Sequence, residues 1–162
     1  MKTSSKRLLG LATLLVLALI GFLLLRPTPV PDRAQITQQI EAARAAGERH
    51  DVGGIMAVFS EHYHDANVPS PIQLRFLLSK IQGNPPTPIQ IVQSAPVIDI
   101  QGDTATSTGH LRVVSSASGR VLYDHDIILQ WRREDGNRLL VIPTKVWRVV
   151  SADYGSFGIL GD

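Results

Sequence analysis

A tyrosine and a histidine two residues apart are the best candidates for chemistry in this sequence. Tyr123 and His125 lie in a run from Val121 to Trp131 whose alternate residues are mostly apolar. Because side chains alternate between the two faces of a β-strand, we expect both residues to point into an apolar interior. A half-buried histidine can act as a general acid or base near neutral pH. The alternative is a structural histidine whose ring nitrogens are satisfied by Tyr123 or by a helix carbonyl group.

The run His62-Tyr63-His64-Asp65 is a second polar cluster. In an extended chain His62 and His64 share a face and could bind a metal ion, but zinc sites usually use three or four protein ligands. No further cysteine or histidine lies close by in the sequence, so we predict no metal site. We expect Asp65 to cap the loop that follows it, and the alternative is that Asp65 lines a pocket.

No residue is assigned a catalytic role. The sequence has no cysteine, no glycine-rich phosphate loop and no Gly-x-Ser-x-Gly motif. Asp99 is the only acid between residues 89 and 100, and we expect its neighbours Ile98 and Ile100 to be buried instead. His110 shares its strand face with threonines, so we expect it to face solvent. We predict no cofactor.

Three stretches before residue 84 carry apolar residues at helical spacing. Each follows a residue whose side chain can accept a hydrogen bond from the first helical turn, which is typical of an N-cap. These caps are Asp32, Asp51 and Ser70, and Pro71 suits the first position of the third helix. The first helix is expected to run to about Glu48. The second is expected to bury Ile55, Met56, Phe59 and Tyr63.

After Pro88 the pattern changes to β-rich runs separated by short turns. Turns of this length join antiparallel neighbours, so we expect a four-stranded antiparallel meander. Three helices followed by such a meander predict an α+β fold, with the helices packed on one face of a curved sheet. The expected strands cover residues 89–100, 104–115, 120–133 and 138–150, with the last turn at Glu134–Asn137.

The order of these elements resembles the nuclear transport factor 2-like (SnoaL-like, cystatin-like) superfamily. The segment IEAARAAGERHDVGGIMAVFSEHYHD is similar to its opening helical pair, and DIILQWRREDGNRLLVIPTKVWRV to its closing hairpin. The resemblance covers roughly residues 33–150. It implies a cone-shaped sheet that encloses an apolar pocket, and members include isomerases, hydrolases and noncatalytic binding domains. The candidate pocket residues are Tyr63, Asp65, Tyr123, His125, Trp131 and Trp147.

The first 26 residues predict a short cytoplasmic segment and a membrane anchor. An uncharged apolar run covers residues 8–25, long enough as a helix to cross a bilayer and contact its lipid. Basic residues precede the run, which predicts that the remainder lies outside the cytoplasm, on the periplasmic side of the inner membrane. The alternative is a cleaved signal peptide. A proline-rich spacer (residues 27–31), the domain (32–150) and a glycine-rich tail (151–162) follow.

Charge excludes one class of partner. The chain has 16 basic and 14 acidic residues, but residues 1–31 hold four of the basic residues and no acidic residue. The remainder therefore carries a net charge of −2, with no run of Lys or Arg, so we predict no nucleic-acid binding.

These features predict a membrane-anchored, noncatalytic domain that binds a small hydrophobic ligand or a protein partner in the envelope. One alternative is an isomerase or hydrolase that acts on a hydrophobic small molecule in the pocket. Another is a scaffold subunit of a secretion-type envelope assembly. A second copy of the chain, bound through the sheet, is a further candidate partner.

Overall fold

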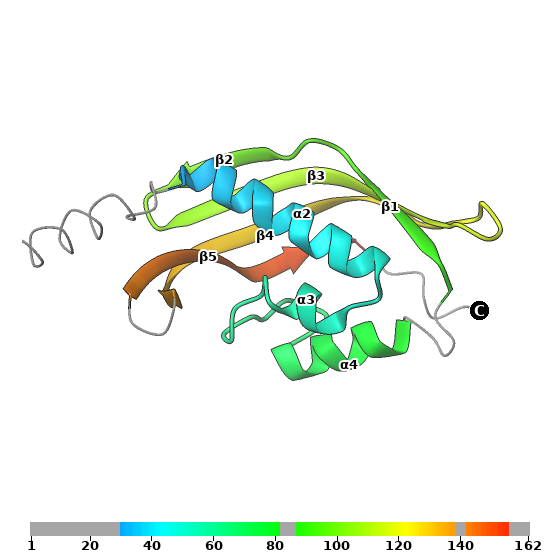
Figure 1. Cartoon of the computed structure of the whole chain (residues 1–162), viewed down its shortest axis with the longest axis horizontal. Helices are drawn as coiled ribbons and strands as arrows, with labels where there is room; N and C mark the ends of the chain where they lie inside the picture. The colour runs from blue at the N-terminus through cyan, green and yellow to red at the C-terminus, as the bar shows by residue number, and fades with distance from the viewer. Residues whose placement is uncertain (1–29, 82–86, 139–141, 156–162) are drawn as a thin grey trace, which may run out of the picture. The chain divides into compact units, whose positions relative to one another are not determined.

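The computed structural model describes residues 30–81, 87–138 and 142–155. From Pro31 onward these residues form one compact unit, in which three helices pack against one face of an antiparallel sheet (Figure 1). The helices are α2 (Asp32–Glu48), α3 (Val52–Met56) and α4 (Pro71–Ile81). The strands are β1 (Ile89–Gln93), β2 (Val97–Gln101), β3 (Thr104–Ser115), β4 (Val121–Arg138) and β5 (Ile142–Asp153). The predicted α+β class is confirmed.

The sheet has five strands, and the predicted four-stranded meander was wrong in its first strand. The run at 89–100 divides into β1 and β2, which pair with opposite ends of β3 along the same edge. The division falls next to Pro96, which has no N–H group to donate to a neighbouring strand. The order β1-β3-β4-β5 is otherwise that of a meander.

The last predicted turn was also wrong. Glu134 pairs with Val146 and Asn137 with Pro143, so β4 continues through the whole segment expected to turn. Turn-forming residues can remain extended when each has a partner on the adjacent strand, because tertiary pairing overrides local preference. β5 likewise ends at Asp153 rather than at residue 150.

The start of α2 differs from the prediction at its cap. Pro31 is the N-cap, and Asp32 is the first helical residue and makes no capping hydrogen bond. The Asp32 carboxylate instead bonds to Arg133 and accepts a hydrogen bond from Trp147 Nε1 at 3.1 Å. A charge-assisted contact to the sheet has replaced the local cap, and it holds the helix start against β4 and β5.

The second helix is much shorter than predicted. Asp51 caps α3 as expected, accepting a hydrogen bond from the Gly54 N–H group at 2.9 Å, but α3 ends at Met56. The chain then runs beside β5: the Ser60 N–H donates to Val149 O at 2.9 Å, and the Val149 N–H donates to Val58 O at 3.0 Å. Phe59 and Tyr63 therefore lie outside any helix, because these backbone groups are paired with a strand.

The third helix begins as predicted. The Ser70 hydroxyl accepts a hydrogen bond from the Gln73 N–H group at 3.3 Å, and Pro71 is the first helical residue. Leu74 is buried in the core, and Leu77 and Leu78 pack against it. One face of α4 is thus fixed to the domain, and the other faces solvent.

The alternation predicted for β4 holds only over the part of the strand that other elements cover. Trp131 and Tyr123 are buried, but His125 is exposed and Val121 is 39% exposed. The strand pairing shifts between Val113 and Val114, and the β3–β4 turn extends past the helices (Figure 1). The expectation of a half-buried His125 was therefore wrong.

The predicted anchor at residues 8–25 lies outside the described residues, as does most of the spacer. Within the described part of the chain, no helix is long and apolar enough to cross a membrane.

Candidate ligand-binding cavity

A cavity of about 230 Å³ lies between the first two described helices and the inner face of the sheet. Helix α2 presents Ile40, Ala43 and Gly47 to it, and Ile55 comes from α3. The sheet supplies apolar side chains from four strands, β1, β3, β4 and β5, because alternate residues of a strand share a face. These sheet residues include Ile91, Leu111, Ile127, Leu129, Trp131 and Val149.

Few polar groups line this cavity, and two of them are already engaged. The Ser107 hydroxyl, which is buried, accepts a hydrogen bond from Trp131 Nε1 at 2.8 Å. The Arg44 guanidinium bonds to Glu41 at 2.9 Å and to Glu48 at 3.1 Å. The hydrogen bond that Arg44 donates to Glu41, together with the charges of both carboxylates, raises the pKa of Arg44. Arg44 is therefore a neutralised cation at this site, with Gln93 as a further polar neighbour.

Asp65 is the centre of a separate polar cluster. Its carboxylate accepts hydrogen bonds from the backbone N–H groups of Asn67 and Val68, both at 2.6 Å, and from the hydroxyl of Tyr63. The Tyr154 hydroxyl lies 3.5 Å from the same carboxylate. Burial, followed by the bond to Asp65, raises the pKa of Tyr63. Asp65 caps its loop as predicted, and three of its about four acceptor positions receive close hydrogen bonds.

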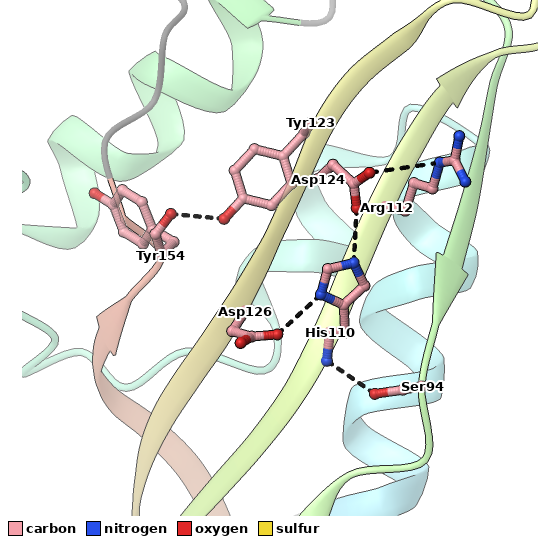
Figure 2. Close-up of polar contacts among 7 residues, drawn as sticks. All are labelled: Ser94, His110, Arg112, Tyr123, Asp124, Asp126 and Tyr154. Carbon is pink, nitrogen blue, oxygen red and sulfur yellow. Dashed lines mark hydrogen bonds and ion pairs between the residues drawn. The ribbon is translucent and has the colours of Figure 1, made fainter.

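Tyr123 and His125 lie near the end of β5. The Tyr123 hydroxyl donates to the carbonyl oxygen of Tyr154 at 2.6 Å (Figure 2), and burial raises the pKa of Tyr123. The His125 ring packs beside the Tyr123 ring with 5.1 Å between centroids. The hydrogen bond between Tyr123 and Tyr154 holds the residue after β5 against β4, although Tyr154 lies in the segment predicted to be a tail.

Trp147 is fully buried where α2 begins. Its ring lies 5.0 Å from the Arg133 guanidinium carbon, and its backbone N–H donates to Gln35 Oε1 at 3.2 Å. With the bond from its indole nitrogen to Asp32, Trp147 joins helix and sheet. Of the six predicted pocket residues, Trp131 lines the cavity described above. The other five residues make different contacts: Tyr63 bonds to Asp65, Tyr123 contacts Tyr154 and His125, and Trp147 bonds to Asp32.

The outer face of the sheet carries a charged cluster, which Figure 2 shows. His110 is exposed, as predicted. Its Nε2 lies 2.6 Å from Asp124 and its Nδ1 lies 2.9 Å from Asp126. Hydrogen bonds to Asp126 and Asp124 raise the pKa of His110. Because carboxylates only accept hydrogen bonds, both contacts are satisfied when the imidazole is protonated on both nitrogens. Arg112 lies 3.8 Å from Asp124.

Across the described residues, no three His, Asp or Glu side chains are arranged to hold a metal ion. The cavity-lining residues of α2 and β3 were not singled out from the sequence. The α2 residues Ile40, Ala43 and Gly47 did have a signal in their helical spacing, but periodicity alone does not separate a cavity wall from a filled core.

No protein-family model and no curated protein matches this chain. Solved structures do match. A protein of unknown function from Pseudomonas putida KT2440, described as nuclear transport factor 2-like, gives a TM-score of 0.62 at 17% identity, over 78% of this chain and 87% of that chain. A protein of unknown function with a cystatin-like fold from Nostoc punctiforme gives a TM-score of 0.60 at 15% identity, over 76% of this chain and 90% of that chain. A nuclear transport factor 2-like protein with a cystatin-like fold from Novosphingobium aromaticivorans gives a TM-score of 0.57 at 17% identity, over 75% of this chain and 79% of that chain. The chain therefore has the cystatin-like fold of these proteins.

Proposed function

We propose that the domain binds a small, uncharged, apolar ligand in the cavity between α2, α3 and the sheet, without catalysis. The observation that carries this proposal is the lining, which is apolar apart from Arg44, Gln93 and Ser107. Apolar pockets with a few polar groups are typical of small-molecule sites.

The cavity volume bounds the size of the ligand. An apolar protein cavity of about 150 Å³ holds benzene, so a cavity of about 230 Å³ fits one or two rings or a short branched chain. Charge bounds its chemistry. Arg44 is neutralised by Glu41 and Glu48, so a carboxylate ligand would lose its hydration without gaining a free cation.

The positions of the acid–base groups are the reason why we propose binding without catalysis. Among the described residues that line the cavity there is no Asp, Glu or His. Asp65 accepts hydrogen bonds from its own loop, and His125 is exposed beyond the helical layer. We further propose, from the apolar run at 8–25, that the domain is anchored in the inner membrane and faces the envelope.

The test compares two probes of equal shape on the full chain. 2-Naphthol is uncharged at neutral pH, and 2-naphthoate is an anion. We expect 2-naphthol to bind, as measured by titration calorimetry, and 2-naphthoate to bind at least about tenfold more weakly because its charge must be desolvated. Equal affinity for the two probes, or no binding of either, would contradict the proposal.

Matched variants locate the probe. Ala43→Phe fills the cavity from α2, whereas Ala42→Phe adds the same ring at an exposed position of the same helix. We expect Ala43→Phe to abolish 2-naphthol binding and Ala42→Phe to leave it unchanged. If Ala43→Phe does not fold, as judged by circular dichroism, Ala43→Leu gives a smaller obstruction and a graded loss.

A second candidate is association of two copies through the outer face of the sheet. Val97 pairs with Thr108 and Thr108 with Ile128, so the two apolar residues lie on one row across three strands. Val97 is 74% exposed. We propose that the outer faces of two sheets pack on each other with this row at the centre, and we expect Val97→Asp to convert a dimer to a monomer in light scattering. A wild-type monomer at high concentration would exclude it.

A further inference from the structure

Helix α4 exposes two large apolar side chains on one side. Ile72 is 82% exposed and Phe76 is 62% exposed. They are four residues apart in a helix, so they are neighbours on its surface. The opposite side of α4 is the one that packs, through Leu74, Leu77 and Leu78. Burial of the helix against the domain thus leaves a second, solvent-facing apolar pair.

Two cations accompany this pair. Arg75 and Lys80 are exposed, and α4 contains no acidic residue. Lys80 Nζ lies 4.7 Å from the centroid of the Phe76 ring, so one of the charges sits directly over the exposed apolar surface. From residue 32 onward the chain has 12 basic and 14 acidic residues. Helix α4 is therefore a positive element on a domain of net negative charge.

Helix α4 lies where its outer side can contact a flat partner. Figure 1 shows α4 at the margin of the domain, with α3 between it and α2. The outer side of α4, defined by Ile72, Arg75, Phe76 and Lys80, is called the α4 face below. Two apolar residues and two cations are too few for a protein interface, which buries about 800 Å² on each partner.

We propose that the α4 face docks on an anionic lipid surface. Interfacial helices place Phe and Leu-like side chains at the boundary between headgroups and acyl chains, with Lys and Arg beside them. Here Ile72 and Phe76 enter that boundary, and Arg75 and Lys80 contact lipid phosphates. Anionic lipid attracts nearby basic residues, which selects an anionic surface over a zwitterionic one. The contact involves residues of the folded domain and is separate from the apolar run at 8–25.

The absence of cysteine from the sequence allows a clean test. A single cysteine at Ser79→Cys, on α4 beside the apolar pair, carries an environment-sensitive fluorophore on the full chain. The same label at Ala42→Cys, on the exposed side of helix α2, is the matched control. In liposomes of mixed phosphatidylglycerol and phosphatidylcholine we expect emission at 79 to rise about threefold with a blue shift, as for entry into the interface. Emission at 42 stays constant.

Two double variants separate the contributions. Ile72→Ser with Phe76→Ser removes the apolar contact, and Arg75→Gln with Lys80→Gln removes the charge. Both are exposed changes, and thermal unfolding checks that the fold is kept. We expect each to abolish the rise at 79. An equal rise in pure phosphatidylcholine, a rise at 42 as well, or no rise overturns the proposal. A rise that follows protein concentration without lipid also overturns it, and makes the α4 face a protein interface.

Discussion

Asp65 illustrates how a titratable residue at a candidate position can be structural. Its carboxylate receives two backbone N–H groups and the hydroxyl of Tyr63, a buried tyrosine. A base needs a free lone pair directed at its substrate, and three donors of the protein itself already bond to this carboxylate. The cluster therefore stabilises the loop before α4 and the residue that follows β5.

The Asp65 cluster predicts a stability effect. We expect Asp65→Ala to lower the free energy of unfolding by about 1–3 kcal/mol, because the Asn67, Val68 and Tyr63 donors lose their acceptor. Asp99→Ala is the control, since Asp99 is exposed, and we expect a change within about 0.5 kcal/mol. Urea unfolding measures both. Equal effects in the two variants would show that Asp65 has no special role in stability.

His110 predicts a pH-dependent contribution to stability. Its pKa is raised in the folded state by Asp126 and Asp124, so the folded state binds the proton more tightly than the unfolded chain. The contribution is fully present below the unfolded value, about 6.5, and is lost as the pH rises through the higher folded value.

The measurement compares melting temperatures of wild type and His110→Gln. We expect the wild type to be favoured at about pH 5.5 and the difference to shrink by about pH 9, where the imidazole is neutral. Thr106→Gln, an exposed change on the same strand face, controls for the long side chain. A difference that does not vary with pH would contradict the assignment.

At the scale of elements, the turn between β2 and β3 depends on one backbone conformation. Gly102 has φ of +62° and open space around its missing side chain. We expect Gly102→Ala to lower the free energy of unfolding by about 1–2 kcal/mol, because the left-handed conformation is unfavourable for alanine. Gly109→Ala is the matched control, since its nearest contact would be an ordinary 3.5 Å from Ser94. Calorimetry should separate the two variants, and a neutral Gly102→Ala would show that this turn can rearrange.

Element types were predictable where local chemistry and tertiary pairing agree. Ser70-Pro71 placed the start of α4, and Asp51 placed the start of α3. The ends were not predictable, because they depend on partners remote in sequence: Ser60 pairs with β5, and Glu134 with Val146. Pro96 could have signalled the division of β1 from β2, since a proline in a strand removes a ladder donor.

The candidate site was predictable only in part for the same reason. Alternation along β4 identified Trp131 as an inward residue, and it lines the cavity. It also selected His125, because a sequence does not reveal which length of a strand the helices cover. Tyr154 was missed, since its burial depends on Asp65 and Tyr123 rather than on any local pattern.

For the whole molecule, ligand binding and stability are coupled. A ligand that binds the folded state alone adds about 2.7 kcal/mol at a concentration 100 times its Kd. We therefore expect 2-naphthol to raise the melting temperature of wild type and Ala42→Phe, and to leave that of Ala43→Phe unchanged. Equal stabilisation of all three proteins would place the probe outside the cavity.

The two margins of the sheet carry a consequence for behaviour at high concentration. One margin is divided into β1 and β2 beside Pro96, and the other is partly covered where residues 58–64 bond to Val149 and Val150. A long, unpaired strand margin is a template for addition of strands from other molecules, and proteins avoid fibrils by interrupting or covering it. This architecture leaves the outer face of the sheet open to association while its margins resist polymerisation.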